Sequence, residues 1–270
     1  MPAPQVSGDR SIIDRTFSVL EAFNFRDRTL TMSDISQRSG LPVATTYRIV
    51  KKLLSWGALE RTEGSRYSIG LQLWEIALLA PQYSALRAVA MPYMLQLQAH
   101  ARASVALTVQ DKLEGICLES VWSGEASCRG AGSVGNRFPL YSAASGRVLL
   151  AYASPEMQEE FYAQDPHAYT KWTETDPLVL RAHVDRAKRQ GYAICDREMN
   201  ENYCSVAAPV FDGTGAVIAA ISLITGTENG DATQRAKPVL TTAKLISERF
   251  AALHGPEGEK RRRRPARQSR

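Results

Sequence analysis

Cysteine is scarce in this sequence, and the cysteines present are widely separated. The four of them, Cys117, Cys128, Cys195 and Cys204, form no Cys-x-x-Cys pair and have no histidine at metal-ligand spacing. Small secreted domains need dense disulfide frameworks, and zinc sites need clustered ligands, so neither class of protein fits this chain. We expect free thiols in a reducing cytoplasm, and we expect no metal.

Long apolar runs are also missing. No uninterrupted apolar stretch approaches the ~20 residues of a membrane span, and the first ten residues, MPAPQVSGDR, lack the apolar core of an export signal. These absences predict a cytoplasmic protein without a membrane partner. At 270 residues and 44% apolar content, the chain is long enough for about two domains with ordinary hydrophobic cores.

Motifs that mark enzymes are absent as well. There is no glycine-rich phosphate loop, and Ser145-Gly146-Arg147 lacks the Gly-x-Ser-x-Gly context of a nucleophilic serine. Asp196-Arg197-Glu198 could supply acid–base groups, although a solvated strand end explains it more simply. The histidines at positions 100, 167, 183 and 254 stand apart from one another. We therefore expect no catalytic residues, no cofactor and no enzymatic activity.

Positive charge is concentrated at one end of the chain. The formal net charge of +5 would on its own invite a nucleic-acid partner. Residues 255–270, however, hold seven Lys and Arg against two Glu, so the basic character belongs to this tail. We expect the tail to be disordered. Its run Arg261–Arg264 either adds sequence-independent attraction to DNA phosphates or is only a solvated end.

The first 70 residues follow the order of elements of a winged helix-turn-helix. Apolar residues recur at helical spacing, Gly40 and Pro42 mark a tight turn, and Thr62-Glu63-Gly64-Ser65 separates two short strands. The predicted elements are helices beginning at Ser11, Thr31 and Val43 and ending near Phe25, Gly40 and Trp56, then strands over Ala58–Arg61 and Arg66–Ile69.

Strands and helices are mixed in the rest of the chain, which predicts an α+β domain. An apolar helix over Leu71–Ala80 leads to a linker at Pro81-Gln82-Tyr83-Ser84, and a long amphipathic helix follows over Ala85–Ala103. The predicted strands are Val105–Val109, Gly115–Ser120, Tyr192–Cys195, Ser205–Phe211 and Ala216–Leu223. The further predicted helices are Ala143–Ala153, Pro155–Tyr162, Leu178–Gln190 and Asp231–His254.

Small, hydroxylated and basic side chains gather at the exposed face of the third helix. In a helix-turn-helix this helix enters the major groove, where hydroxyls and cations meet phosphates or base edges and Thr or Ala methyls meet thymine methyls. Such folds also serve as dimerisation modules, but the small and cationic face argues against that use. The predicted DNA-binding residues are Ser33, Gln37, Val43, Ala44, Thr45, Thr46, Tyr47 (partly buried), Arg48, Lys51, Lys52, Arg61 and Arg66.

Several stretches, in order, resemble the IclR family of bacterial transcription regulators. They are Ser-Asp-Ile-Ser-Gln-Arg-Ser-Gly-Leu-Pro at 33–42, Thr-Thr-Tyr-Arg at 45–48, Arg-Tyr-Ser-Ile-Gly at 66–70, a stretch at 139–151 similar to the family's Pro-Leu-His-x-x-x-x-Gly-Lys-x-Leu-Leu-Ala, and the blocks Gly191–Val210 and Ala219–Gly226. The resemblance spans about residues 10–254. It implies a GAF-like effector-binding domain, double-stranded operator DNA and a small-molecule effector as partners, and a homodimer or a dimer of dimers (homotetramer).

The resemblance also implies an effector pocket, and this sequence departs from the most polar members there. An Asp of the glyoxylate-responsive members falls on Cys195, or on Asp196 after a one-residue slip, and one Ser of a pair falls on Ile224. Both departures remove hydrogen-bonding groups, so we hypothesise a larger, less polar effector such as an aromatic acid. Cys195 and Ser205 are almost equally well explained as core-facing strand residues. The implied effector-binding positions are Ala143, Ala144, Ser145, Cys195, Asp196, Ser205, Ser222 and Ile224.

These expectations combine into one organisation. A winged helix-turn-helix occupies residues 10–71, a linker helix 72–84, an effector-binding domain 85–254, and a basic disordered tail 255–270. The expected function is control of a catabolic operon, as a repressor or an activator, by a small molecule. The two alternatives are an enzyme that carries a DNA-binding module and a ligand-free architectural DNA binder, which would have no cavity in its second domain.

Overall fold

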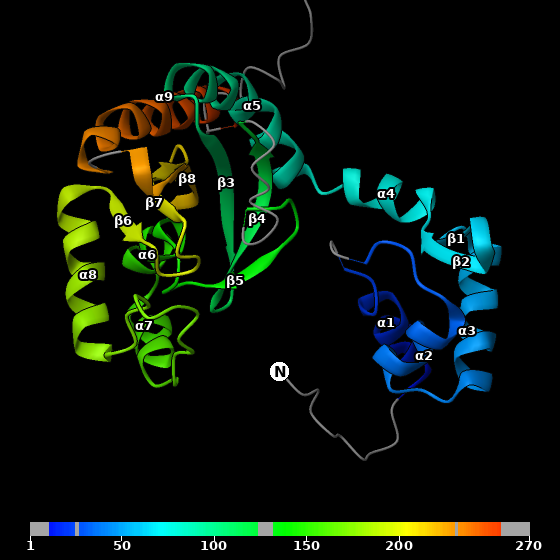
Figure 1. The fold of residues 1–270 in the computed structure, drawn as a ribbon. Coiled ribbons are helices and arrows are strands. Elements are labelled where there is room, and N and C mark those ends of the chain that lie inside the picture. The colour runs from blue at the N-terminus through cyan, green and yellow to red at the C-terminus, as the bar shows by residue number, and fades with distance from the viewer. Residues whose placement is uncertain (1–10, 25–26, 124–131, 230–231, 255–270) are drawn as a thin grey trace, which may run out of the picture. The chain divides into compact units, whose positions relative to one another are not determined.

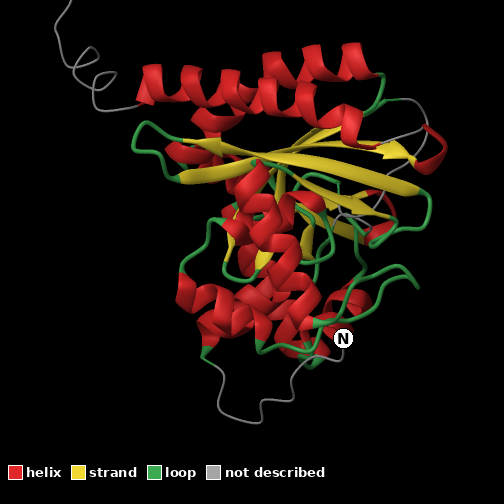
Figure 2. Cartoon of the chain, turned by 90° about the vertical axis from the view of Figure 1, so that its left-hand side faces the viewer, coloured by secondary structure: helices red, strands yellow, loops and turns green. Residues whose placement is uncertain are grey.

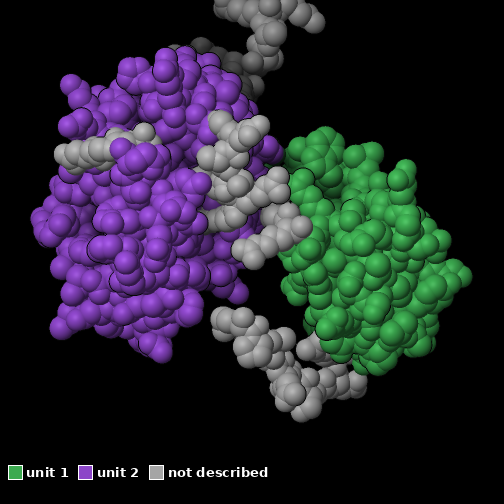
Figure 3. Space-filling model, viewed as in Figure 1, with its two compact units in different colours: residues 1–84 green, residues 85–270 purple. Residues whose placement is uncertain are grey.

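The structure is a computed structural model of the chain, and it describes residues 11–24, 27–123, 132–229 and 232–254. These residues form two compact units, residues 1–84 and 85–270 (Figure 3). The predicted basic tail at 255–270, the thiol of Cys128, and the start of the first predicted domain at residue 10 lie outside the described residues.

The first unit has three helices followed by a two-stranded hairpin (Figure 1), which is the order of a winged helix-turn-helix. Ser11 and Thr31 each begin a helix with a capping box, in which the hydroxyl accepts from the N–H of Asp14 or Asp34 and that carboxylate accepts in return. The elements are α1 (Ile12–Glu21), α2 (Met32–Ser39), α3 (Val43–Trp56), β1 (Leu59–Thr62), the 3-10 turn η1 (Glu63–Ser65) and β2 (Arg66–Ile69).

The turn between α2 and α3 depends on Gly40, whose φ of 66° is in the left-handed region. The hairpin is fastened to the helices by Leu30 and Tyr67, whose backbones exchange hydrogen bonds of 2.9 and 2.8 Å. Val19, Ile35, Leu59 and other apolar side chains fill the core beneath. One face of α3 is thereby buried, and the opposite face is left at the surface.

The connection between the units differs from the prediction. α4 (Leu71–Leu78) ends two residues before α5 (Pro81–Ala101), so residues 81–84 are the first turn of α5 rather than a linker. Proline suits the first turn of a helix because its missing N–H would have no intrahelical partner there. The Pro-Gln-Tyr-Ser stretch therefore marks where a helix begins.

The second unit is built on a six-stranded antiparallel sheet in the order β5-β4-β3-β8-β7-β6. Five of these strands overlap the predicted ones, and β5 was not predicted because it has only three residues. Their bounds are β3 (Ser104–Asp111), β4 (Glu114–Val121), β5 (Arg137–Pro139), β6 (Ala193–Asp196), β7 (Tyr203–Phe211) and β8 (Val217–Gly226).

Helices cover both faces of the sheet, as Figures 1 and 2 show. Val206, Ala208 and Val210 of β7 belong to the core that includes α5 and α9 (Ala236–His254), whereas Ala207 belongs to the core that includes α6 (Ala144–Ala151). This alternation is the two-residue period of a strand buried on both faces. The remaining elements are α7 (Pro155–Tyr162), α8 (Pro177–Gln190), η2 (Thr227–Asn229) and η3 (Ala232–Arg235). The α+β prediction is confirmed.

Candidate functional site

The exposed face of α3 carries most of the predicted DNA-binding residues. Its exposed residues recur at helical spacing, and their side chains include the aromatic ring of Tyr47 and the cations of Arg48 and Lys51. The exposed members of the predicted set on this helix are Val43, Ala44, Tyr47, Arg48, Lys51 and Lys52, and Ser33 and Gln37 are exposed on α2. Two adjacent helices thus present small, polar and basic groups together.

Thr46 corrects the prediction for this helix. We expected its hydroxyl on the exposed face, but Thr46 is 0% exposed and the hydroxyl donates to the backbone oxygens of Pro42 (3.1 Å) and Leu41 (3.4 Å). Thr45 is half-buried. Thr46 therefore fastens the start of α3 to the preceding turn, and its side chain is not available to DNA.

The two arginines of the wing have partners within the first unit. The Arg61 guanidinium lies over the Tyr67 ring at 5.7 Å from its centroid. Arg66 donates from Nη2 to the carbonyl oxygen of Thr29 (2.8 Å) and from Nε to the Thr29 hydroxyl (3.2 Å). Both side chains are exposed, so each can present charge beside α3 while it braces the wing.

The second unit contains a cavity of about 110 Å³ on the sheet face that carries α6, many times the ~10 Å³ that one water requires. Cys195, Ser205 and Ile224 lie directly opposite one another on β6, β7 and β8. Ser222 of β8 lies opposite Ala106 of β3 in the next row of side chains on this face. The cavity floor therefore runs diagonally across four strands.

Six of the eight predicted effector-binding positions line this cavity: Ala143, Ser145, Cys195, Ser205, Ser222 and Ile224. Ala144 is fully buried, and its N–H donates to the Ser205 hydroxyl at 3.4 Å. Asp196 is exposed and paired with Arg197 at 2.8 Å. Because Cys195 rather than Asp196 pairs with Ser205, the one-residue slip would place an aspartate outside this cavity.

The first turn of α6 closes the cavity opposite the floor. Ala143, the residue before α6, offers no side-chain cap, so the N–H groups of this turn that follow Ala144 are available to a ligand. Ser145 lines the cavity at 4% exposure, and its hydroxyl makes no hydrogen bond to any described residue. A helix start with an unpaired hydroxyl is suited to an anion or a hydrogen-bond acceptor.

A buried polar network holds the cavity wall that follows β6. Arg147 of α6 is paired with Glu198, and it donates from Nε to the carbonyl oxygen of Tyr141 at 3.0 Å. Glu198, Met199 and Asn200 all line the cavity. The ion pair thus connects α6 to the wall segment, and neither element can move far without separating buried charges.

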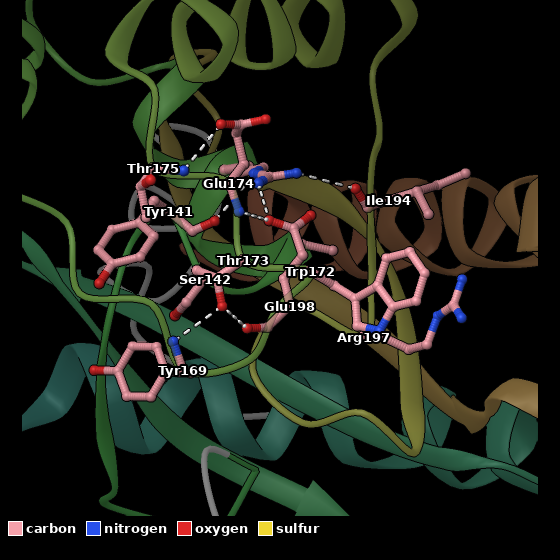
Figure 4. A network of polar contacts seen from close by, with 12 residues as sticks. Tyr141, Ser142, Tyr169, Trp172, Thr173, Glu174, Thr175, Ile194, Arg197 and Glu198 are labelled. Carbon is pink, nitrogen blue, oxygen red and sulfur yellow. Dashed lines mark hydrogen bonds and ion pairs between the residues drawn. The ribbon is translucent and has the colours of Figure 1, made fainter.

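The same wall segment is fastened from outside by residues 170–174 (Figure 4). The Thr173 hydroxyl donates to the Glu198 carbonyl oxygen at 2.6 Å, and the N–H of Glu174 donates to the Glu198 carboxylate at 3.1 Å. Arg197 lies over the Trp172 ring at 4.0 Å. Glu198 is therefore held through its backbone and its side chain, which makes the wall a preformed part of the cavity.

The cavity is largely uncharged. Burial raises the pKa of the Cys195 thiol far above its ordinary range and that of Cys204 to about 11, so both thiols are neutral at physiological pH. Among the described residues its lining includes no Lys, Arg or His, and its one carboxylate, from Glu198, is paired with Arg147. A ligand here meets apolar surface, hydroxyls and backbone N–H groups.

Some cavity residues carry no signal in the sequence. They come from β3, β5 and the segment after β6, which had no motif to single them out: Ala106, Thr108, Phe138, Met199 and Asn200. Strand alternation would have assigned Ala106 and Thr108 to one face, but not to this face. In the described part of the chain, no cluster of acidic, His or Cys side chains could hold a metal ion, and no helix is long and apolar enough to span a membrane.

The sequence matches two family models, the IclR helix-turn-helix domain over residues 12–63 and the bacterial transcriptional regulator IclR C-terminal domain over residues 81–248. The chain therefore belongs to the IclR family, as its motifs predicted. The family consists of DNA-binding transcription regulators rather than enzymes, and operator DNA and an effector-binding domain follow from that membership.

Individual relatives agree with this assignment. The chain is 29% identical over 239 residues to the Pca regulon regulatory protein of Pseudomonas putida, covering 85% of this chain and 80% of the relative. It is 30% identical over 215 residues to the transcriptional regulator KdgR of Dickeya chrysanthemi, covering 79% of this chain and 70% of the relative. An IclR homologue from Microbacterium hydrocarbonoxydans, solved in complex with 4-hydroxybenzoate, is 31% identical with a TM-score of 0.84, covering 90% of this chain and all of that one.

Proposed function

We propose that this regulator senses a compact aromatic acid and controls an operon for the breakdown of that acid or a related compound. The carrying observation is the composition of the cavity, in which Cys195 and Ile224 replace more polar groups. A small hydrophilic acid would leave polar atoms of its own without partners there, whereas a benzene ring fits between apolar walls. The 4-hydroxybenzoate bound by the Microbacterium homologue supports this effector class.

The carboxylate of such an effector would bind at the start of α6. The donors on offer at this end of the cavity are the uncapped N–H groups that follow Ala144 and the Ser145 and Ser205 hydroxyls. Since the described lining has no cationic side chain, the partial positive charge of the helix start would stabilise the carboxylate. The ring would then extend over Ile224 and Ser222 of β8.

On the DNA side, we propose that Ser33 and Gln37 of α2, the exposed residues of α3, and Arg61 and Arg66 of the wing contact the operator. α3 would read base edges in the major groove while the arginines bind phosphates. We further propose a cytoplasmic homodimer or dimer of dimers that acts as a repressor. The effector would favour one arrangement of the reading heads, limited by its difference in affinity for the two arrangements.

Thermal shift measurements test the effector class. 4-Hydroxybenzoate and benzoate should raise the melting temperature of the full chain at concentrations where glyoxylate does not. Ile224→Ser should weaken benzoate binding by roughly tenfold or more because it removes apolar contact with the ring. Selective stabilisation by glyoxylate would contradict the proposal. Operator binding, measured by mobility shift on the upstream DNA, should change when the stabilising acid is added.

A further inference from the structure

The cavity has a second polar group, the hydroxyl of Thr108, at the end away from the start of α6. Thr108 of β3 lines the cavity and is 1% exposed. Its hydroxyl makes no hydrogen bond to any residue that the structure describes, whereas the nearby Ser222 hydroxyl donates to the Ala106 carbonyl oxygen at 3.4 Å. This hydroxyl borders the cavity and can still donate and accept a hydrogen bond, so a polar group of a ligand placed beside it would be stabilised.

The packing around Thr108 occupies its methyl group and leaves its hydroxyl available to the cavity. A Cβ added to Gly115 would lie 3.1 Å from the Thr108 methyl carbon and 2.8 Å from the Phe138 ring. The methyl and the ring therefore both pack over the bare backbone of Gly115 on the neighbouring strand β4. With its methyl occupied in this way, Thr108 has its hydroxyl as the group available to a ligand.

The strand pairing is irregular at this same residue. Leu107 is paired with Glu119 and Thr108 with Cys117, so that Leu118 of β4 is an extra, unpaired residue. Such a β-bulge bends the strand and changes the direction of neighbouring side chains, and bulges are frequent beside binding sites. The bulge is thus a feature of the backbone, independent of the hydroxyl, that sets this position apart from the regular sheet.

Thr108 and the start of α6 are at opposite ends of the floor. The Ala144 N–H contacts Ser205, which lies opposite Ile224 of β8. Thr108 lies opposite Ala220 of β8, two rows of side chains further along. Ile224 and Ser222 lie between these ends.

We propose that Thr108 sets the specificity of the pocket by recognising a hydroxyl on the aromatic ring of the effector, at the position opposite the carboxylate. This inference rests on the proposed aromatic acid effector. The regulator then selects a hydroxylated aromatic acid over its unsubstituted parent. Benzoate would leave the Thr108 hydroxyl unpaired, whereas 4-hydroxybenzoate would exchange a hydrogen bond with it. Selection by a hydrogen bond that the parent acid cannot make is the most effective way to distinguish these two ligands.

Calorimetric titration of the full chain with 4-hydroxybenzoate and benzoate tests this assignment. The wild type should bind 4-hydroxybenzoate roughly 2- to 12-fold more tightly, the range expected of one neutral hydrogen bond. Thr108→Val should bind benzoate at least as well as the wild type and lose the preference, and Thr108→Ser should retain it. Thr242→Val, which alters a threonine of similar burial in α9 away from the cavity, should keep the wild-type preference.

Each outcome separates this inference from the proposed function. Binding of both acids with an unchanged preference in Thr108→Val would overturn the role of Thr108 and leave the effector class intact. Failure of the wild type to bind either acid would overturn the effector class and this inference together. The ligand-free Thr108→Val protein should melt no lower than the wild type, because a methyl replaces an unpaired hydroxyl; a clearly lower melting temperature would show that the hydroxyl has a partner and would also overturn the inference.

Discussion

The Arg147 guanidinium and the Glu198 carboxylate form an ion pair inside the second unit, with side chains 2% and 9% exposed. The two residues come from α6 and from the segment after β6, and both of those elements line the cavity. Because Glu198 also accepts from the Glu174 N–H, three separate segments of the chain meet at one carboxylate. The shape of the cavity wall therefore depends on this pair.

Breaking the pair from one side should cost much stability. Arg147→Met leaves the Glu198 carboxylate buried without a counter-charge, and we expect a loss of about 3–5 kcal/mol in the free energy of unfolding, measured by chemical denaturation. Arg137→Met is the matched control, because Arg137 pairs with Asp111 and Glu114 at the surface and should lose at most about 1 kcal/mol. Equal losses in the two variants would show that the buried pair contributes no more to the free energy of unfolding than the surface pairs do.

Stability should also fall in mildly acidic solution because of His183. Burial, together with the charge of Arg147, lowers the pKa of this half-buried histidine, and its Nδ1 atom has no hydrogen-bond partner in the described structure. The unfolded chain, with a pKa near 6.5, takes up a proton before the folded one does. The contribution of neutral His183 to the free energy of unfolding is therefore complete above about pH 6.5. It is lost as the pH falls towards the lower pKa of the folded state.

Denaturation midpoints measured between pH 8 and pH 5.5 test this dependence. His183→Gln should make the decline shallower, whereas the exposed-site control His100→Gln should retain it. A decline of the same steepness in His183→Gln and the wild type would assign the proton uptake to another group.

Two residues of α3 that lie two positions apart, Thr46 and Arg48, should have different roles. Arg48→Ala should weaken operator binding in a mobility shift assay while leaving the melting temperature unchanged, because the side chain is exposed. Thr46→Val should instead lower the stability of the first unit by about 1 kcal/mol, since it removes the hydroxyl that donates to Pro42. Unaltered operator affinity and sequence preference in Arg48→Ala would remove Arg48 from the DNA interface.

Gly146 should tolerate no side chain. An added Cβ would lie 2.3 Å from the Leu140 carbonyl oxygen and 2.6 Å from its Cα, both of them backbone atoms that cannot rotate away. Gly146→Ala should push α6 off the cavity, destabilise the unit by about 1–3 kcal/mol or more, and weaken benzoate binding in the same calorimetric titration. Gly226→Ala is the control, because the atoms it would meet belong to the flexible Glu228 side chain; an equal effect there would contradict the steric argument.

Local patterns predicted most elements of the fold, because helical spacing and strand alternation are properties of neighbouring residues. The exposure of Thr46 could not be decided in this way: it lies one position from the exposed Tyr47, and only the packing of the preceding turn determines which of them faces inward. β5 escaped prediction because three residues are too few to show alternation.

The resemblance to the family predicted those site residues for which it supplied positions. It could not predict residues whose place in the cavity depends on how the strands pair. Whether Cys195 or Asp196 faces the cavity depends on which of them lies opposite Ser205, and that register is a tertiary property. Thr108 and Phe138 come from strands distant in sequence from β6 and β7, and nothing local marks them. Likewise, 51 positions separate Arg147 from Glu198, so the ion pair has no sequence signal.

The alternation along β7 separates two kinds of evolutionary constraint. Ser205 and Ala207 face α6 and the cavity side, whereas Val206 and Ala208 belong to the core beneath α5 and α9. A substitution at a cavity position can therefore change what the regulator responds to while the opposite core keeps its composition. The same sheet can be adapted from one metabolite to another in small steps, each of which leaves a folded protein on which selection can act.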